Sequence, residues 1–397
     1  MRFLCVNKPV RANIFGQDFE LKPLESHAEN VEDILGMDNF AASELISRHG
    51  DHLLEVTFNH GKPKDFPKIL DNLSDIEPES NVLIIRNGGI GDHILFLPAI
   101  RTYRKMLPPK SKIWLSVQKD KHPIYYNNKD IERLYPLPLG LDIFLKADYL
   151  IEFTEKNDIQ DFKRLHMSDY YLNFMKIDYK NIKNKQPKIE WDHKRSSKIT
   201  PLFEGVKKRN SDKPFILLNW KASNRLRDIP PEKLLFLTEI FKKEIMFVVA
   251  QQSNLSKAVN KLVGDRRKNV LNFTPAMDSL EDYISAIANC DAVITTDTAT
   301  GHLAEALGKP SLVIYGPTID DNWIRYYKYT YPLRAKYSGT TCCSPCGLTK
   351  NTEQGCPESV LLGTPYSPCL LHISQERICS EFSQILTHVT GNKGFSL

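Results

Sequence analysis

Short apolar runs alternate with amphipathic, helix-type segments along most of this 397-residue chain. A first series of apolar runs lies at Val82–Ile85, Ile113–Val117 and Tyr149–Phe153. A second series lies at Phe215–Leu218, Ile245–Ala250, Val270–Phe273, Ala292–Thr295 and Ser311–Tyr315. Short apolar runs separated by helical segments are typical of buried parallel strands that are joined by helices. The pattern therefore predicts an α/β chain with two successive parallel sheets.

The segments between these runs show helical spacing of apolar residues. Helices are predicted at His93–Met106, Pro231–Phe241, Leu255–Leu262, Ser279–Asn289 and Gly301–Leu307. Before residue 79 the chain is polar and irregular, with strand-like pieces at Phe3–Val6, Phe19–Leu21 and Leu53–Phe58 and a helical stretch near Phe40–Arg48. We expect residues 1–78 to form a small appended module, to which no pattern assigns a function.

Composition and charge narrow the class of protein. With 41% hydrophobic and 25% charged residues, the chain has the composition of a globular protein. No apolar run approaches the ~20 residues needed to cross a bilayer, and the segment Met1–Pro9 is too short for a signal peptide. We therefore expect a cytoplasmic protein. No nucleic-acid-binding motif is present, so no nucleic-acid partner is expected.

The net charge of +5 is concentrated in residues 179–213, where many Lys and Arg residues occur. This stretch separates the two strand series and is interpreted as a solvated interdomain linker. The alternative is a basic surface that contacts an acidic glycan or, peripherally, the anionic inner leaflet of the inner membrane.

The segment 297–318 carries the strongest signal for ligand binding. A buried run ends in Thr295-Thr296-Asp297, and a helix begins directly afterwards. The first turn of a helix has unpaired N–H groups and a positive dipole end, both of which favour a phosphate. Its candidate residues are Asp297, Thr298, Ala299, Thr300, Gly301 and His302. The alternative is an ordinary strand–helix unit in which Asp297 or Thr298 only caps the helix.

A second motif, Gly88-Gly89-Ile90-Gly91-Asp92-His93, follows the first buried run. It lacks the third glycine of a dinucleotide-binding fingerprint. Asp92 stands at the start of a helix, where a carboxylate can act as a general base or as a helix cap.

The two motifs together resemble glycosyltransferase family 9, the bacterial heptosyltransferases. The family pattern, Asp-Ser/Thr-Gly-x-x-His-Leu-Ala-x-x-Leu-Gly-x-Pro followed by a strand and Gly-Pro-Thr, matches residues 297–318 without a gap. The resemblance covers about residues 80 to 375. It implies a GT-B fold, with two Rossmann-like doubly wound domains facing a cleft. On this basis we expect an acceptor domain at 79–178, a linker at 179–213, a nucleotide-sugar domain at 214–335, a Cys-rich insert at 336–372 and a C-terminal helix and tail at 373–397.

The resemblance also implies roles for individual residues. Asp92 corresponds to the general base, and Gly89, Gly91 and His93 to the acceptor-side loop. Ser223, Arg227 and residues 297–302 correspond to the donor-binding segments, with Arg227 in the place of a family Lys. The chain departs from the pattern at Ala299, which replaces a Gly, and at Ile229, which replaces a Trp. It also lacks a Glu in the loop Gln251–Asn254, so the nucleotide base is left open.

The C-terminal region holds a cluster of cysteines. Cys343 and Cys346 form a C-x-x-C pair, and Cys356 and Cys369 follow. This spacing suits a four-thiolate site for structural zinc or iron, and some family members have a similar stretch. Free thiols are the alternative, because disulfides are disfavoured in the cytoplasm.

The resemblance implies an inverting transfer of a sugar, heptose or related, from a nucleotide-diphosphate donor. ADP-heptose is the expected donor, and the expected acceptor is a hydroxyl of a lipopolysaccharide core, another lipid-linked glycan or a protein. No Asp-x-Asp pair offers a metal clamp for the diphosphate, so no cofactor is expected for catalysis. Alternatives are a nucleotide-sugar epimerase or hydrolase of the same fold, and an inactive sugar-nucleotide-binding scaffold.

Overall fold

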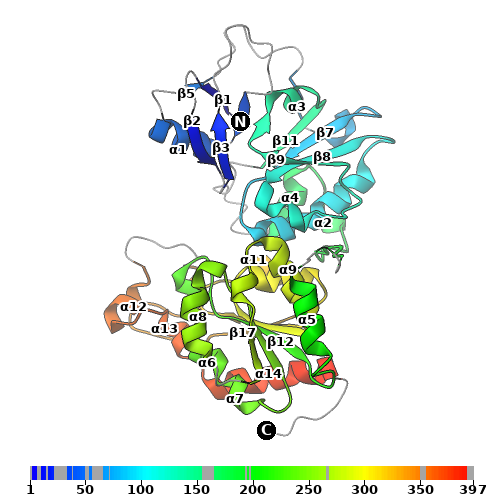
Figure 1. Cartoon of the computed structure of the whole chain (residues 1–397). Helices are drawn as coiled ribbons and strands as arrows, with labels where there is room; N and C mark the ends of the chain where they lie inside the picture. Colours follow the sequence, from blue (N-terminus) through cyan, green and yellow to red (C-terminus); the bar gives the residue numbers. More distant parts are fainter. Residues whose placement is uncertain are drawn as a thin grey trace. The chain divides into compact units, whose positions relative to one another are not determined.

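The computed structural model describes residues 2–6, 10–14, 17–21, 34–37, 39–49, 53–55, 66–70, 72–153, 165–192, 195, 198–264, 268–348 and 355–390. The chain folds as two compact units, Met1–Lys185 and Gln186–Leu397 (Figure 1). The division falls inside the basic stretch 179–213.

The N-terminal unit begins with two small antiparallel sheets. Its first elements are β1 (Arg2–Val6), β2 (Val10–Ile14), β3 (Gln17–Leu21), β4 (Leu35–Met37), α1 (Asn39–His49) and β5 (Leu53–Glu55). Strands β2 and β3 pair with each other, and a four-stranded sheet has the order β10-β4-β1-β5, where β10 is Leu139–Gly140. Phe3 and Ile34 pack in one apolar cluster with Leu83 and Ile85. The predicted module is therefore joined to the rest of this unit by strand pairing and by a shared core.

A five-stranded parallel sheet forms the main body of the N-terminal unit. Its elements are β6 (Lys68–Ile69), β7 (Asn81–Ile85), α2 (Ile90–Met106), β8 (Lys112–Gln118), β9 (Arg133–Leu137), α3 (Leu141–Leu145), β11 (Tyr149–Glu152) and α4 (Met167–Phe174). The strand order is β6-β11-β7-β8-β9, and neighbouring strands are parallel. Strand β7 is buried from Val82 to Ile85, as expected for a central strand that helices cover on both faces.

The C-terminal unit contains a six-stranded parallel sheet. Its strands are β12 (Phe215–Asn219), β13 (Met246–Val249), β14 (Val270–Asn272), β15 (Ala292–Thr296), β16 (Ser311–Tyr315) and β17 (Thr330–Arg334). The spatial order is β14-β13-β12-β15-β16-β17. Numbered from β12, this is the order 3-2-1-4-5-6 of a doubly wound nucleotide-binding sheet.

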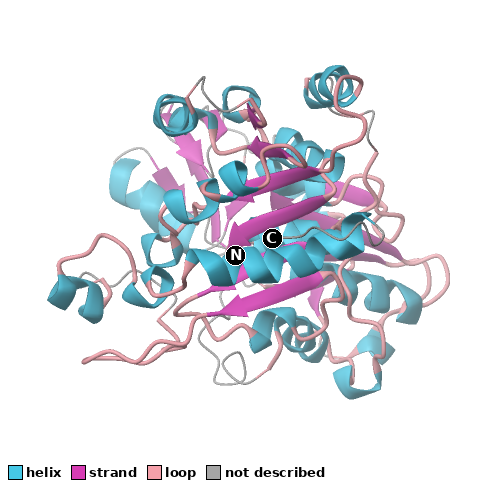
Figure 2. Cartoon of the chain, turned by 90° about the horizontal axis from the view of Figure 1, so that it is seen from below, coloured by secondary structure: helices cyan, strands magenta, loops and turns pink. Residues whose placement is uncertain are grey.

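Helices cover the sheet of the C-terminal unit (Figure 2). The helices of this unit are α5 (Ile199–Lys207), α6 (Glu232–Leu235), α7 (Leu237–Ile240), α8 (Ser256–Val263), α9 (Leu280–Asn289), α10 (Ala299–Ala306), α11 (Asp321–Ile324), α12 (Pro357–Leu362), α13 (Pro368–Leu371) and α14 (Gln375–Thr390). Helix α14 buries Ile378, Phe382 and Leu386 in one apolar cluster with strand residues such as Phe247 and Leu312. The C-terminal helix thus completes the core of this unit.

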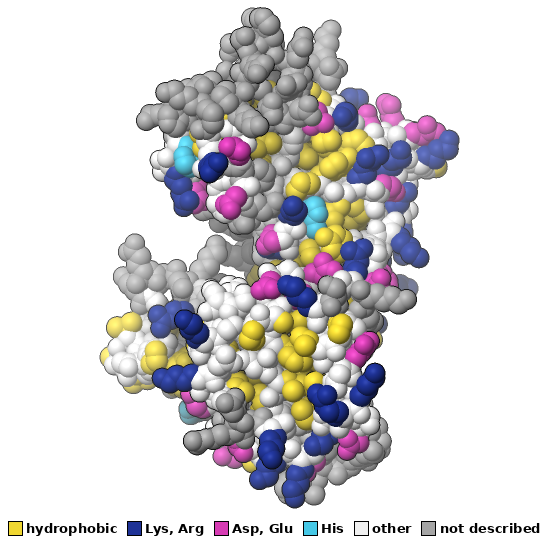
Figure 3. Space-filling view, in the orientation of Figure 1, with side chains coloured by type: hydrophobic (Ala, Val, Ile, Leu, Met, Phe, Trp, Pro, Cys, Tyr) yellow, Lys and Arg dark blue, Asp and Glu magenta, His cyan; other side chains and the backbone are white. Residues whose placement is uncertain are grey.

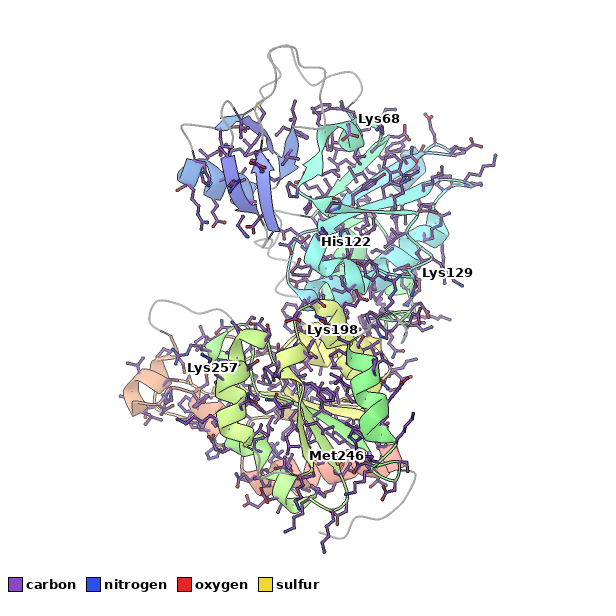
Figure 4. All side chains as sticks on the ribbon, viewed as in Figure 1. Lys68, His122, Lys129, Lys198, Met246 and Lys257 are labelled. Carbon is purple, nitrogen blue, oxygen red and sulfur yellow. The ribbon has the colours of Figure 1, made fainter. Side chains whose placement is uncertain are left out.

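Two features of the basic stretch 179–213 differ from a solvated linker. One is helix α5, which lies within this stretch. Ile199 and Phe203 of α5 are fully buried, and Phe203 packs against Phe215 and Phe273. Lys185 is also buried, and its ammonium lies 2.5 Å from the carboxylate of Asp169. Lys198, labelled in Figure 4, forms an exposed ion pair with Asp278.

Some of the observed helices and strands differ from the predicted ones. The predicted helix Pro231–Phe241 is two short helices, α6 and α7, and β9 and β17 were not predicted because Pro136 and Pro332 interrupt their apolar runs. Residues 56–58 of one predicted strand and residues 391–397 of the tail lie outside the described residues.

On the face shown in Figure 3, basic side chains are interspersed with acidic ones over both units. Among the helices that the structure describes, none has the length and hydropathy of a membrane span.

Candidate functional site

Both parallel sheets have a switch point where the strand order reverses. In the C-terminal unit it lies between β12 and β15, whose residues Asn219 and Thr295 are paired in register. In the N-terminal unit it lies between β7 and β11, whose residues Ile85 and Glu152 are paired. Open parallel sheets bind ligands outside the carboxyl ends of the strands at such a point. The two sequence motifs follow β7 and β15 directly, so both begin at a switch point.

A polar cluster joins the segment after β12 to the segment after β15. Arg227 lies at the end of a short turn, Arg225–Arg227, and its Nη1 is 3.3 Å from Oδ2 of Asp297. Its Nη2 donates to the Ser223 hydroxyl over 3.1 Å. The hydroxyl of Thr318 donates to Oδ2 of Asp297 over 2.6 Å. Ser223, Arg227 and Asp297 were predicted from the sequence, and Thr318 completes the group.

The charged side chains of this cluster are largely shielded from solvent. The Asp297 side chain is 8% exposed and that of Arg227 is 21% exposed. Buried carboxylates require a countercharge or hydrogen-bond donors, and Arg227 and Thr318 supply both. The Nε of Arg227 is buried and lacks a hydrogen-bond partner within the described part of the chain, so one donor of the guanidinium is not used by the protein.

A second network ties the carboxyl ends of β12 and β13 to helix α10. Asn219 Nδ2 donates to the Thr300 hydroxyl over 2.7 Å, and Gln251 Nε2 donates to Asn219 Oδ1 over 2.8 Å. The Tyr283 hydroxyl lies 2.6 Å from the Thr300 hydroxyl. Burial is the main reason that the pKa of Tyr283 is raised, so its phenol stays protonated. The network fixes the first turn of α10 against the sheet.

The first turn of α10 partly fits the expectation of a phosphate site. Thr298 is the N-cap residue, and its side chain makes no capping hydrogen bond. The carboxylate of Asp297 binds Arg227 and Thr318. Thr298 and Ala299 are half-buried, whereas Thr300 is buried. The N–H groups at the start of α10 are therefore not covered by a capping side chain from Thr298.

Three predicted donor residues make other contacts that account for them. The Thr300 hydroxyl accepts a hydrogen bond from Asn219 and is hydrogen-bonded to the Tyr283 hydroxyl. A Cβ on Gly301 would stand 3.0 Å from Val313 Cγ2, so glycine here permits close packing of α10 on β16. His302 Nδ1 lies 2.5 Å from the Tyr327 hydroxyl. All three residues thus make contacts within the C-terminal unit that hold α10 in place.

On the N-terminal side, Asp92 lies in the first turn of α2. Its Oδ2 accepts the backbone N–H of Gly89 over 2.8 Å, so Asp92 does close the start of the helix. Its other carboxylate oxygen, Oδ1, has no hydrogen-bond partner among the residues that the structure describes, and the side chain is 28% exposed. Asp92 thus binds the start of α2 through Oδ2, and its Oδ1 is available for another hydrogen bond. Gly91 lies within the same first turn.

His93 does not lie on an acceptor-side surface, contrary to expectation. Its side chain is fully buried, and Nδ1 lies 2.7 Å from the Tyr125 hydroxyl. Burial, followed by the charges of Arg86 and Lys121, holds the pKa of His93 well below its usual value. The imidazole is therefore neutral at neutral pH. His122, labelled in Figure 4, lies on the nearby turn Lys119–Ile124, and burial lowers its pKa as well.

The cysteine-rich segment is held by Glu358. Its carboxylate accepts the N–H groups of Thr340 (2.9 Å) and Thr341 (2.7 Å), the Thr341 hydroxyl and the Tyr337 hydroxyl (3.0 Å). The Thr341 hydroxyl and these N–H groups lower the pKa of Glu358 to about 2. No group of three or more His, Cys, Asp or Glu side chains within the described ranges has the placement of a metal site.

The thiols nevertheless influence one another. Besides burial, the charges of Cys346 and Cys356 raise the pKa values of both Cys342 and Cys369, and that of Cys369 reaches about 12. The set predicted from the spacing is Cys343, Cys346, Cys356 and Cys369. Cys343 is exposed, and its backbone forms an isolated bridge with Ser338.

Sequence reasoning missed several residues that build these sites: Arg86, Tyr125, Tyr171, Asn219, Tyr283 and Thr318. Arg86 and Asn219 did give a signal, because each polar side chain stands at the carboxyl end of a buried apolar run. Tyr125, Tyr171 and Tyr283 come from elements that only the tertiary fold brings to the site.

The model of glycosyltransferase family 9 (heptosyltransferase) matches residues 146–356, which is more than half of the chain. Lipooligosaccharide heptosyltransferase 2 of Haemophilus influenzae is 38% identical over 58 residues. That match spans 15% of this chain and 15% of the relative.

Solved structures are similar in fold. A family 9 glycosyltransferase from Veillonella parvula gives a TM-score of 0.57 at 15% identity, covering 78% of this chain and 98% of its own. ADP-heptose LPS heptosyltransferase II of E. coli gives 0.55 at 15% identity, covering 78% and 99%. TibC, an iron-containing dodecameric glycosyltransferase of enterotoxigenic E. coli, gives 0.51 at 11% identity, covering 85% and 80%. Together with the sheet orders, these likenesses confirm the predicted fold of two Rossmann-like domains.

Proposed function

Because the chain belongs to glycosyltransferase family 9, we propose that it transfers a sugar from a nucleotide-diphosphate donor to an acceptor hydroxyl, with inversion at the anomeric carbon. The donor that we propose is ADP-heptose or a related nucleotide sugar. The acceptor is a lipopolysaccharide core, another lipid-linked glycan or a protein. One E. coli structure of similar fold is an ADP-heptose LPS heptosyltransferase, which supports both choices.

The observation that carries the proposal is the Arg227–Asp297 pair at the switch point of the C-terminal sheet. Negative charge develops on the leaving diphosphate during glycosyl transfer, and fixed cations and N–H groups stabilise such charge. The Arg227 side chain is 21% exposed, so part of this cation is open to a phosphate oxygen. The N–H groups of Thr298 and Ala299 add the helix dipole.

The acceptor hydroxyl must lose a proton as it attacks the anomeric carbon. We assign this proton to Oδ1 of Asp92, because Oδ2 is bound to the Gly89 N–H while Oδ1 is available. A general base needs only to come within hydrogen-bond reach of the hydroxyl. Acceptor activation thus belongs to the N-terminal unit and donor binding to the C-terminal unit.

In this scheme the diphosphate is bound without a metal ion. The sequence has no Asp-x-Asp pair, and a guanidinium can bind two phosphate oxygens at once. Arg227 and the start of α10 would therefore perform the role that a divalent cation performs elsewhere.

A panel of nucleotide sugars tests the proposal. The full chain is titrated by calorimetry with ADP, UDP, GDP and CMP sugars, and the preferred donor is then incubated with lipopolysaccharide cores and Ser/Thr peptides. We expect one base to be preferred and the sugar to appear on an acceptor. Conversion of the donor without any acceptor would indicate an epimerase or hydrolase. Absence of binding to every donor would contradict the proposal and favour an inactive scaffold.

For the cysteine-rich segment we propose a structural zinc or iron ion held by Cys343, Cys346, Cys356 and Cys369. The C-x-x-C spacing of Cys343 and Cys346, followed by two further cysteines, supports this set. Four thiolates suit either metal. Such an ion would stabilise the segment that follows β17 and would take no part in the transfer.

A further inference from the structure

We infer that Arg86 is a positioning residue for Asp92 and that Tyr171 holds Arg86 in place. The inference rests on the proposed function, in which Asp92 is the general base. It adds that the carboxylate is held from one side by a buried cation, so that Oδ1 is the oxygen presented to the acceptor hydroxyl.

Arg86 lies directly after β7 and is almost fully buried, with 2% of its surface exposed. Its Nη2 donates to the Tyr171 hydroxyl over 2.6 Å and lies 4.0 Å from Oδ2 of Asp92. Its Nη1 donates to the backbone carbonyl of Asn87. The guanidinium also lies over the Tyr171 ring, 5.1 Å from the centroid. Side chain, backbone and ring together fix its orientation.

Arg86 and the Gly89 N–H act on the same oxygen of Asp92. The Gly89 N–H donates to Oδ2 over 2.8 Å, and the Arg86 cation faces Oδ2 as well. A carboxylate whose rotamer is fixed through one oxygen keeps its second oxygen in a constant position. This is the preorganisation that proton abstraction requires, because small displacements of a catalytic group are costly in rate.

Gly88 allows the two charged groups to meet. Its φ is +149°, and a Cβ at this position would stand 2.9 Å from Arg86 Nη2 and 3.0 Å from Asp92 Oδ2. Both side chains therefore use the space over the α-carbon of Gly88. The first glycine of the motif is explained by this arrangement rather than by contact with a ligand.

The other polar side chains around the pair are those of Tyr171, Tyr125 and His93. Tyr171 and Tyr125 are buried phenols whose pKa values burial raises, so both are neutral. His93 is neutral as argued above. The described acid whose charge favours the Arg86 cation is Asp92. Asp92 is thus the described carboxylate that faces the Arg86 cation, at 4.0 Å.

The test compares two tyrosine variants in the full chain. Tyr171→Phe removes the hydroxyl that holds Arg86 and keeps the ring. Tyr103→Phe is the matched control, because Tyr103 is also fully buried, and its hydroxyl has no hydrogen-bond partner within the described residues. We expect kcat of Tyr171→Phe to fall about tenfold while KM for the donor changes less than about twofold. The control should keep the parent kcat.

A second variant addresses the charge itself. Arg86→Lys keeps a cation but cannot reach Tyr171 and Asp92 together, so we expect it to retain more kcat than Arg86→Met, with the same donor KM. Parent kcat in Tyr171→Phe, or equal losses in the Lys and Met variants, would overturn the inference and leave the proposed function standing. Absence of sugar transfer by the parent chain would overturn the proposed function and the inference with it.

Discussion

Arg227 and Asp297 are 70 residues apart in the chain, yet the guanidinium of Arg227 lies 3.3 Å from the carboxylate of Asp297. The pair links the segment after β12 with the segment after β15, the two strands that flank the switch point. A buried carboxylate orients the arginine, and the arginine offsets the cost of burying the carboxylate. The pair positions a cation where the donor diphosphate is proposed to bind.

The first prediction concerns the shape of that cation. Arg227→Lys keeps the charge but loses the planar fork that can bind two phosphate oxygens and Asp297. We expect the Kd for the nucleoside diphosphate of the preferred donor to rise about tenfold, which is about 1.4 kcal/mol. Arg225→Lys, at an exposed position on the same turn, is the control and should bind like the parent. Equal losses of affinity in both variants, measured by calorimetry, would count against a specific role of Arg227.

The second prediction concerns the packing of α10. Gly301→Ala places a methyl group 3.0 Å from Val313 Cγ2, and we expect the free energy of unfolding to fall by about 1 to 3 kcal/mol. Adding Val313→Ala should recover part of this loss, so the two changes are not additive. Gly205→Ala in α5 is the control, since no atom lies within 4 Å of its added Cβ. It should be neutral or stabilising in urea unfolding; a loss as large as that of Gly301→Ala would refute the packing explanation.

The third prediction concerns pH. The native state keeps His93 neutral, because burial holds its pKa well below the usual value, whereas the unfolded state protonates it below about pH 6.5. Its contribution to stability is therefore present above pH 6.5 and is lost as the pH falls, at up to about 1.4 kcal/mol per pH unit. His93→Gln should show a flatter dependence than the parent when urea unfolding is compared at pH 7 and pH 5. Parallel pH dependences would show that His93 is protonated in the folded protein.

The fourth prediction identifies the cysteines of the proposed metal site. Cys346→Ser should lower the zinc or iron content of the purified protein to background, because it removes one thiolate of the C-x-x-C pair. Cys342→Ser is the matched control, because Cys342 lies next to the predicted set but outside it, and it should retain the metal. Elemental analysis that reverses this order would contradict the set predicted from the sequence. A metal-free parent chain would contradict the site altogether.

The sequence predicted the sheets and the two switch-point motifs, because buried parallel strands give continuous apolar runs and helix starts carry small and polar residues. Strand β16 was placed at Ser311–Tyr315, as observed. Strands β9 and β17 were missed, since a proline lies in each. The sequence also did not show that Ile199 and Phe203 would fold part of the basic stretch into α5.

The candidate site was only partly predictable. Asp92, Ser223, Arg227 and Asp297 stand in motifs, so their order in the chain was enough to select them. The surroundings of a residue were not readable, so the sequence did not show that His93 is buried or that Gly301 packs against Val313. Arg86 and Tyr171 come from different elements, and only the folded unit brings them together.

The central claim, that Asp92 is the base of a sugar transfer, is tested most directly by Asp92→Asn with the preferred donor and its acceptor. Asparagine keeps the size of the side chain and can still accept the Gly89 N–H, but it cannot take up a proton. We expect unchanged donor affinity by calorimetry and a loss of about 10²- to 10⁴-fold in the rate at which nucleoside diphosphate is released in the presence of the acceptor. Release at the parent rate would contradict the account.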